Sequence, residues 1–275
     1  MALLGKRLAV AIPDTVLEEH DSPRDKTVKL GSMARACAVY GVDVVEIFAD
    51  HKGRGESMRI KKVLEYLETP QYLRKRIYPL DEDLRYAGLL PPLRTPSHRP
   101  KVSIEALVVG EIREGVTNPD GTVDIGLDRA PRLRDRTTAD RRVTVRVTSK
   151  SPLTAEVIQR KEVEDYWGYT VESKTIGEVL GDARFGLKIA TSRAGVSLQT
   201  QLPLLRDALA RASSVMLLFG APSRGLFDIV GRSLNERVDC VVNLFAEQHV
   251  ETVRTEEAVY AGLNLLNILS FSWKA

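Results

Sequence analysis

Three short segments in the last third of the chain combine glycine, arginine and small polar residues, and each follows an apolar run. TSRAG occupies residues 191–195, GAPSRG occupies residues 220–225, and a polar stretch at 246–254 follows the Val-rich run 238–245. Glycine lets a backbone approach a ligand closely. In open α/β sheets, ligands bind in the crevice beyond the carboxyl ends of the strands. The pattern therefore favours a binding crevice. The alternative is that the three segments are ordinary strand–loop–helix connections that bind no ligand.

The segment that follows these loops has the pattern of a helix. Thr255 is the expected N-cap, and Glu256 and Glu257 lie in the first turn, where carboxylates offset the positive end of the helix dipole. Residues 258–269 are apolar almost all round. A helix with so little polar surface is buried on most sides, either in the core or against another subunit.

A second chemical feature is a cluster of six arginines in the middle of the chain, at positions Arg129, Arg132, Arg134, Arg136, Arg141 and Arg142. Guanidinium groups hydrogen-bond phosphates in pairs and stack on bases, which suits RNA. Residues 91–150 hold 12 Lys and Arg against 8 Asp and Glu, a net charge of +4, whereas the whole chain carries +3. The cluster predicts RNA contact, and a solvated loop is the alternative because Asp128, Asp135 and Asp140 lie nearby.

Alternating strand and helix patterns set the fold class. Strand patterns at residues 7–12 and 42–48 alternate with helical patterns at 26–40 and from residue 57. A β–α–β–α order implies a mostly parallel sheet in an α/β protein.

From residue 90 the pattern changes. PPLRTPSHRP cannot continue a helix and is typical of a linker. Short strand patterns at 102–109, 122–127 and 143–148 predict a small inserted β-barrel, and OB-folds are small barrels that bind oligonucleotides. We therefore predict two domains. The barrel insert covers residues 92–163, and a discontinuous α/β domain covers residues 1–91 and 164–275.

Composition and missing motifs exclude several classes. Apolar content of 43% and charged content of 28% over 275 residues are those of a folded soluble protein. No apolar run approaches the ~20 residues that span a bilayer. Two cysteines and four scattered histidines give neither a disulfide framework nor a zinc site. Phosphate-loop and G-x-G-x-x-G motifs are absent. We expect a cytoplasmic protein with no membrane association and no metal.

The loops carry a resemblance to a known class. VVNLFAEQHVETVRTEEAV at 241–259 resembles the C-terminal loop and helix of SPOUT-class RNA methyltransferases, and VMLLFGAPSRGL at 215–226 resembles the loop that holds S-adenosylmethionine in that class. KIATSRAG at 188–195 is similar to a Thr-Ser segment of an archaeal and eukaryotic branch. The resemblance extends over most of the chain and implies a C-terminal trefoil knot and an inserted OB-like barrel.

The resemblance also implies a set of functional residues. The knot's loops would hold S-adenosylmethionine through Thr191, Phe219, Gly220, Ala221, Pro222, Asn243, Leu244, Gln248, Val253, Arg254, Thr255 and Glu256. Arg193 and Arg24 are the candidate catalytic residues, although Arg193 lies in SRAG where the family pattern has Arg next to Gly. No residue stands out as a general base. The implied partners are ribosomal or transfer RNA and a second copy of the chain.

The predicted function is therefore an S-adenosylmethionine-dependent RNA methyltransferase. Two other functions stay open at this point. One is an RNA-binding ribosome-assembly factor that retains the fold without turnover, and the other is an α/β enzyme for a small nucleotide whose basic insert is a solvated lid.

Overall fold

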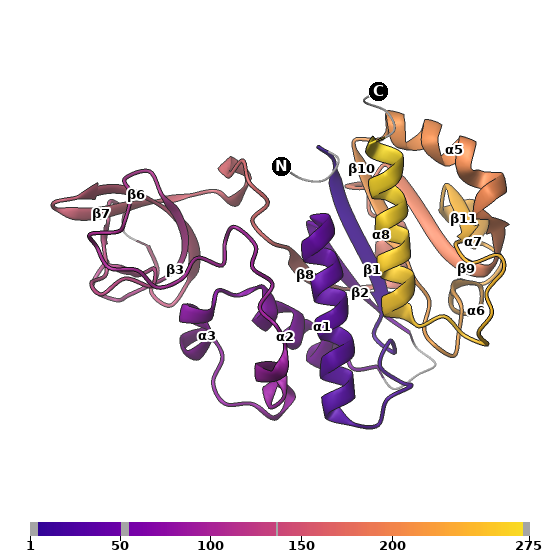
Figure 1. The fold of residues 1–275 in the computed structure, drawn as a ribbon, viewed down its shortest axis with the longest axis horizontal. Coiled ribbons are helices and arrows are strands. Elements are labelled where there is room, and N and C mark those ends of the chain that lie inside the picture. Colours follow the sequence, from indigo (N-terminus) through magenta and orange to yellow (C-terminus); the bar gives the residue numbers. More distant parts are fainter. Residues whose placement is uncertain (1–4, 51–54, 136, 272–275) are drawn as a thin grey trace. The chain divides into compact units, whose positions relative to one another are not determined.

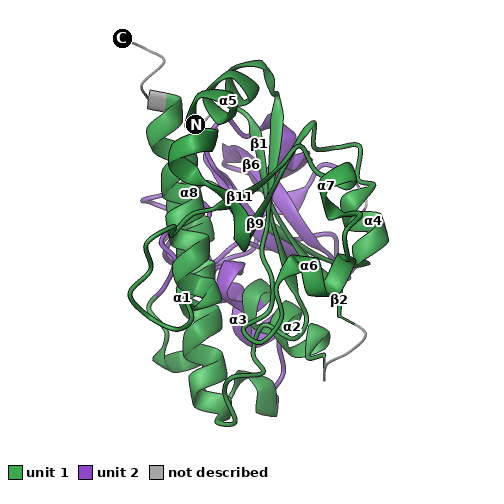
Figure 2. Ribbon diagram, turned by 90° about the vertical axis from the view of Figure 1, so that its right-hand side faces the viewer, with its two compact units in different colours: residues 1–65, 82–91, 169–275 green, residues 66–81, 92–168 purple. Residues whose placement is uncertain are grey.

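The computed structural model describes residues 5–50, 55–135 and 137–271 of the chain, which divides into two compact units (Figure 2). The first, called the sheet unit here, comprises residues 1–65, 82–91 and 169–275. The second, called the barrel unit, comprises residues 66–81 and 92–168. The barrel unit thus includes a segment that precedes the predicted insert, and it ends five residues later than residue 163.

The sheet unit is built on six strands, and every strand pairing in it is parallel. Their order is β11-β9-β10-β1-β2-β8. The strands are β1 (Arg7–Pro13), β2 (Val44–Ala49), β8 (Thr170–Thr175), β9 (Leu187–Ser197), β10 (Ser214–Leu218) and β11 (Cys240–Asn243). The predicted mostly parallel α/β sheet is confirmed, and the carboxyl ends of its strands lie at one edge because all strands run the same way.

Helices cover both faces of this sheet (Figures 1 and 2). Helices α1 and α8 lie side by side along one face, where Gly262 of α8 packs against Leu217 and Phe219. Helices α4, α6 and α7 lie along the other face and share its buried apolar cluster. The helices of this unit are α1 (Pro23–Tyr40), α4 (Ile176–Leu180), α5 (Leu198–Arg211), α6 (Leu226–Val230), α7 (Leu234–Arg237) and α8 (Thr255–Phe271), together with most of α2 (Ser57–Glu68).

Local sequence explains the ends of α1. Pro23 stands in the first turn, where its missing N–H costs no hydrogen bond. Gly41 ends the helix with φ of 68°, a left-handed conformation that glycine adopts without a steric penalty.

Strand β1 is buried along almost its whole length. All its residues after Arg7 are buried, as expected of a central strand that helices cover on both faces.

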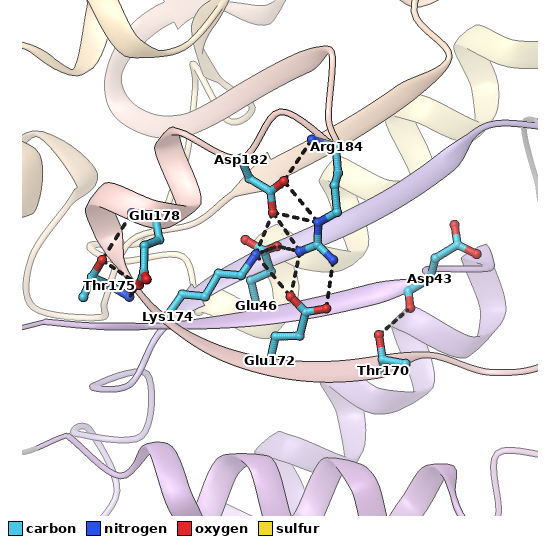
Figure 3. A network of polar contacts seen from close by, with 9 residues as sticks. All are labelled: Asp43, Glu46, Thr170, Glu172, Lys174, Thr175, Glu178, Asp182 and Arg184. Atoms are coloured by element: carbon cyan, nitrogen blue, oxygen red, sulfur yellow. Dashed lines mark hydrogen bonds and ion pairs between the residues drawn. The ribbon is translucent and has the colours of Figure 1, made fainter. Parts of the chain in front are cut away.

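A buried ion network fixes the edge strand β8 to its neighbour β2 (Figure 3). The Nζ of Lys174 lies 2.6 Å from carboxylate oxygens of both Glu46 and Asp182. Arg184 contacts the same two carboxylates and also Glu172, at 2.6 Å. Burial of the fully enclosed Glu46 raises its pKa, and Arg184 is the main cause that lowers the pKa of Glu172 to about 2. The network therefore holds charge inside the unit by pairing it.

The barrel unit contains five short strands in the order β4-β3-β6-β7-β5. They are β3 (Ile112–Thr117), β4 (Val123–Asp124), β5 (Arg132–Leu133), β6 (Arg142–Lys150) and β7 (Leu153–Ile158), and helix α3 (Gln71–Ile77) belongs to the same unit. The N–H of Val123 donates to Pro131 O and that of Leu133 to Gly121 O, both at 3.0 Å. These bonds join the two outer strands, so the sheet closes on itself and leaves no open edge there.

The strand predicted at residues 102–109 is wrong. Only Val102 pairs, through an isolated bridge to Leu127, and Val108 and Val109 are exposed. The backbone here forms turns instead, with Leu107 N donating to Ile104 O at 3.2 Å. Valine-rich composition favours strands, but it decides the outcome only where a partner strand accepts the backbone hydrogen bonds. The strand begins at Ile112.

No helix in the described ranges is both long enough and apolar enough to cross a membrane.

Candidate functional site

A cavity of about 470 Å³ lies in the sheet unit, beside residues 191–194 of β9 and beyond the carboxyl ends of β10 and β11. Three segments line it: residues 191–194, residues 219–225, and residues between 243 and 253. Ala258, in the first turns of α8, also lines it. The cavity therefore collects the three loops that the sequence places after apolar runs.

The first segment reaches the cavity because β9 leaves the ladder with β11. Consecutive residues Val241 and Val242 of β11 pair with Ala190 and Val196, which are six positions apart on β9. Residues 191–195 therefore bulge out of the ladder. Gly195 makes the close approach possible, since a Cβ there would lie 2.8 Å from Val241 O. The bulge turns a regular strand into a wall of the cavity.

The second segment is a tight loop that follows β10. Ala221 N donates to Arg224 O at 2.8 Å, and Gly225 N donates to the Asp228 carboxylate at 2.9 Å. A Cβ at Gly220 would lie 3.0 Å from Arg224 O, so a side chain there would press on the loop's own backbone. Glycine at this position allows the tight turn and leaves backbone groups beside the cavity.

The third segment is tied to the first. The amide Nδ2 of Asn243 donates to Arg193 O at 3.1 Å, and its Oδ1 accepts from Phe245 N at 3.0 Å. Gln248 Nε2 donates to the carbonyls of Val250 and Glu251, at 2.9 and 3.0 Å. Two side-chain amides thus hold the turn that closes the cavity, and that of Asn243 uses both its donor and its acceptor.

Most of the residues predicted to bind the cofactor lie together at this cavity. The lining includes Arg193 and ten of the twelve: Thr191, Phe219, Gly220, Ala221, Pro222, Asn243, Leu244, Gln248, Val253 and Thr255. Arg254 and Glu256 are not among the lining residues, and neither is Arg24, which is exposed in the first turn of α1. Glu256 instead lies 3.2 Å from the buried Nζ of Lys29, so its carboxylate is directed to α1.

Two contacts at the cavity's second segment were not predicted from the sequence. Ser223 donates to the Glu18 carboxylate through both its N–H and its hydroxyl, and Arg224 pairs with the buried carboxylate of Asp50. Glu18 follows β1 and Asp50 follows β2 directly. The available signal for Asp50 was an acidic residue immediately after an apolar strand, whereas Glu18 lies in the polar stretch five positions after the end of β1.

The lining of the cavity suits an organic ligand better than a metal ion. Phe219, Leu244 and Val253 supply apolar surface, and the loops supply backbone groups and amides. Among the described residues, no cluster of three or more His, Cys, Asp or Glu side chains is placed to hold a metal. Pockets of this volume and mixed lining are typical of small-molecule and cofactor sites.

Four of the six arginines predicted to contact RNA lie on the surface. Arg129, Arg132, Arg134 and Arg141 are exposed, and Arg134 lies 3.5 Å from Glu156. Arg136 lies outside the described residues.

Arg142 belongs to the interior of the barrel unit. Its Nη1 lies 2.7 Å from the buried Glu68, and its Nε lies 2.7 Å from the buried Glu114. These two carboxylates raise the pKa of Arg142, while burial raises the pKa of Glu68 against the opposing charges of Arg142 and Arg160. Two of the three guanidinium nitrogens, Nε and Nη1, are therefore paired with buried carboxylates, which need a cation beside them. We place it in this network and not in an RNA-binding set.

Comparison with known proteins decides what kind of enzyme carries this cavity. Residues 7–266 match the family described as "Putative RNA methyltransferase". The chain belongs to this family. The predicted enzyme class is confirmed: the protein is an RNA methyltransferase.

Relatives cover almost the whole RNA methyltransferase chain. It is 34% identical to an uncharacterised protein of Halobacterium salinarum, over 94% of this chain and 98% of the relative. It is 30% identical to a 28S rRNA (uridine-N(3))-methyltransferase of Homo sapiens, over 94% of this chain and 77% of the relative. A protein of Mus musculus with the same name is 31% identical, over 94% and 75% of the two chains.

Proposed function

We propose that this RNA methyltransferase transfers the methyl group of S-adenosylmethionine to N3 of a uridine in ribosomal RNA. The observation that carries the proposal is the meeting of three loops at one cavity of about 470 Å³, with ten of the twelve residues implied by the SPOUT resemblance in its lining. The acceptor follows from the uridine-N(3) activity named for the human relative. Transfer RNA remains the alternative substrate.

Each part of the donor would meet a matching group. The adenine ring would lie on apolar side chains such as Leu244 and Val253, and loop backbone would hydrogen-bond its nitrogens. The carboxylate of the methionine moiety suits a cation, and Arg193 lines the cavity. Binding in a defined shape matters because methyl transfer needs the acceptor in line with the sulfonium.

The reaction balances without a further co-reactant. The uridine N3 loses its proton to solvent, and the N3 lone pair then attacks the methyl carbon. The carbon–sulfur bond breaks, and its electron pair remains on sulfur as the neutral thioether of S-adenosylhomocysteine. Positioning supplies much of the rate, and any group that stabilises the deprotonated base supplies more.

The other parts of the chain fit this reaction in defined roles. We assign RNA contact to the exposed arginines of an OB-like barrel unit, namely Arg129, Arg132, Arg134 and Arg141. We further propose that the segment ending in α8 forms the trefoil knot of the SPOUT class. A homodimer would pack through the outer faces of α1 and α8, where Val28, Val39 and Ile268 are about half exposed.

Cofactor binding gives the first test. Replacing Asn243 by Ala removes the amide that ties the third segment to Arg193 O, so we expect the Kd for S-adenosylhomocysteine to rise about tenfold, or ~1.4 kcal/mol. Isothermal titration calorimetry measures this. Gln199→Ala, which removes an exposed amide on α5 outside the cavity lining, is the matched control and should keep the wild-type Kd. No binding by the wild type, or equal binding by both variants, would count against the proposed cavity.

A further inference from the structure

The side chain of Arg224 crosses from the second cavity segment to the ends of other strands. Its Nη2 pairs with Oδ2 of Asp50, a residue at the end of β2 whose side chain is 2% exposed. The same oxygen accepts from the Thr15 hydroxyl at 3.1 Å, and Asp50 N donates to the Asp14 carboxylate at 2.9 Å. The carboxylate of Asp50 is therefore held by the Thr15 hydroxyl, from the segment after β1, and by Arg224, and this pairing fixes the direction of the guanidinium.

One nitrogen of this guanidinium has no hydrogen-bond partner within the described part of the protein. Arg224 lines the cavity, and its Nη1 is buried without a hydrogen-bond partner among the described residues. A buried donor with no acceptor is costly. The cost is offset where a bound molecule supplies an acceptor oxygen. The backbone O of Arg224 also accepts from Ala221 N, which ties this residue into the turn of the second segment.

We propose that Arg224 is a catalytic residue that hydrogen-bonds a carbonyl oxygen of the target uracil, and that Asp50 is the positioning residue that holds it. The inference rests on the proposed function. It names the feature of the base that is recognised, an imide N–H flanked by carbonyl oxygens. When N3 loses its proton, the negative charge spreads onto those oxygens. The Nη1–H of Arg224 would stabilise that anion until N3 takes the methyl group.

No other charged group at the cavity, among the described residues, is a cation that a buried carboxylate holds in a fixed orientation. The charged residues that line the cavity or contact its second segment are Arg193, Arg224, Asp228, Glu251, Glu18 and Asp50. Arg193 is exposed, and its Nη1 is directed to Glu251 O at 3.4 Å. Arg224 is the lining cation that a buried carboxylate orients, so it is the one prepared for a fixed acceptor position.

The test is single-turnover methylation of ribosomal RNA purified from cells that lack this gene, with 3-methyluridine measured by mass spectrometry across pH 6 to 10. Arg224→Gln should lower the rate at neutral pH about 100-fold, as expected for the loss of one donor to a developing anion. Its rate should keep rising with pH beyond the point where the wild-type rate levels off, because the base must then be deprotonated without help. S-adenosylhomocysteine affinity should stay within about threefold of wild type.

Three further variants complete the design. Arg224→Lys keeps the charge and should retain more activity than Arg224→Gln. Asp50→Asn should lower the rate about tenfold and shift the pH profile in the same direction, because Arg224 loses its fixed orientation. Arg232→Gln, an exposed arginine outside the cavity, is the matched control and should keep the wild-type rate and profile.

Failure of the inference and failure of the proposed function give different results. If the wild type forms no 3-methyluridine, the proposed function fails and the inference falls with it. If the wild type is active and Arg224→Gln matches its rate and pH profile, the inference alone is overturned. Loss of S-adenosylhomocysteine binding in Arg224→Gln would likewise overturn it, since Arg224 would then be a cofactor-binding residue.

Discussion

At the scale of single residues, the four charged side chains around Glu46 show how a buried carboxylate is tolerated (Figure 3). Lys174 and Arg184 face three carboxylates, so neither cation is dispensable. The pKa of Glu172 is lowered to about 2, and that of Asp182 is lowered as well, in both cases with the hydrogen bond from Arg184 as the first cause. Breaking a buried pair is expensive because it leaves an uncompensated charge.

The first prediction here concerns pH. Groups with lowered pKa stabilise the fold above their unfolded pKa and lose that contribution as pH falls through the folded value. For Glu172 this window runs from about pH 5 down to about 2. Arg184→Gln should therefore cost ~2 kcal/mol at pH 7 and distinctly less at pH 3, after allowance for partial exposure. The pKa of Glu46 is raised first of all by burial, which the substitution leaves in place, so this group adds no opposing difference between the two proteins.

Urea unfolding of the wild type and of Arg184→Gln, each at pH 7 and pH 3, measures the loss in unfolding free energy. Arg85→Gln is the control, since Arg85 lies 3.9 Å from Glu82 in an ion pair that is mostly exposed, and such pairs contribute little. An equal loss at both pH values for Arg184→Gln would contradict the linkage argument.

At the scale of elements, the cavity depends on how β9 departs from β11. A regular parallel ladder would keep residues 191–195 in the sheet, whereas the observed pairing skips from Ala190 to Val196. The skipped segment supplies Thr191, Arg193 and the close approach at Gly195. An irregular strand is thus what converts a sheet edge into part of a binding site.

Gly195→Ala tests this element. A Cβ at this position would lie 2.8 Å from Val241 O and from the carbonyl carbon of Val242, and backbone atoms cannot rotate away. We expect a loss of ~1–3 kcal/mol in unfolding free energy and weaker S-adenosylhomocysteine binding, because β9 and β11 must separate. Gly88→Ala is the matched control, since a Cβ there would meet nothing within 4 Å. If Gly195→Ala kept the stability and the affinity of the wild type, the close approach at Gly195 would not be needed for the cavity.

At the scale of the whole molecule, the two units have separate tasks in the proposed reaction. The sheet unit carries the cavity, and the barrel unit carries exposed arginines on a closed barrel. Polyanion binding by such arginines releases counterions, so it weakens as salt rises, and each lost phosphate contact reduces that dependence.

Removing positive charge from each unit in turn tests whether the barrel unit is the part that binds RNA. Arg129→Gln with Arg141→Gln should weaken binding to ribosomal RNA and lower the slope of log affinity against log salt by about 1–2. The comparison variant, Arg206→Gln with Arg232→Gln, removes the same charge from exposed positions of the sheet unit. Fluorescence anisotropy over a salt series measures both. Equal slopes for the two double variants would remove the barrel unit from the proposed RNA contact.

The sequence by itself determined the parallel α/β sheet and the positions of the three loops, because strand and helix patterns and turn residues act over a few positions. The last-helix pattern placed the start of α8 to within one residue, since Thr255, the expected N-cap, is its first helical residue. Local chemistry could not determine pairing partners. The misplaced strand at 102–109 and the role of Arg142 in binding Glu68 and Glu114 both depended on contacts with distant segments.

The same limit applies to the site. Glycine-rich loops could be recognised one by one, but the bulge of β9 depends on where β11 pairs, and the orientation of Arg224 depends on Asp50, 174 positions away. Only the tertiary structure decided these, since a side chain's direction and its partner are set by packing between elements far apart in the chain.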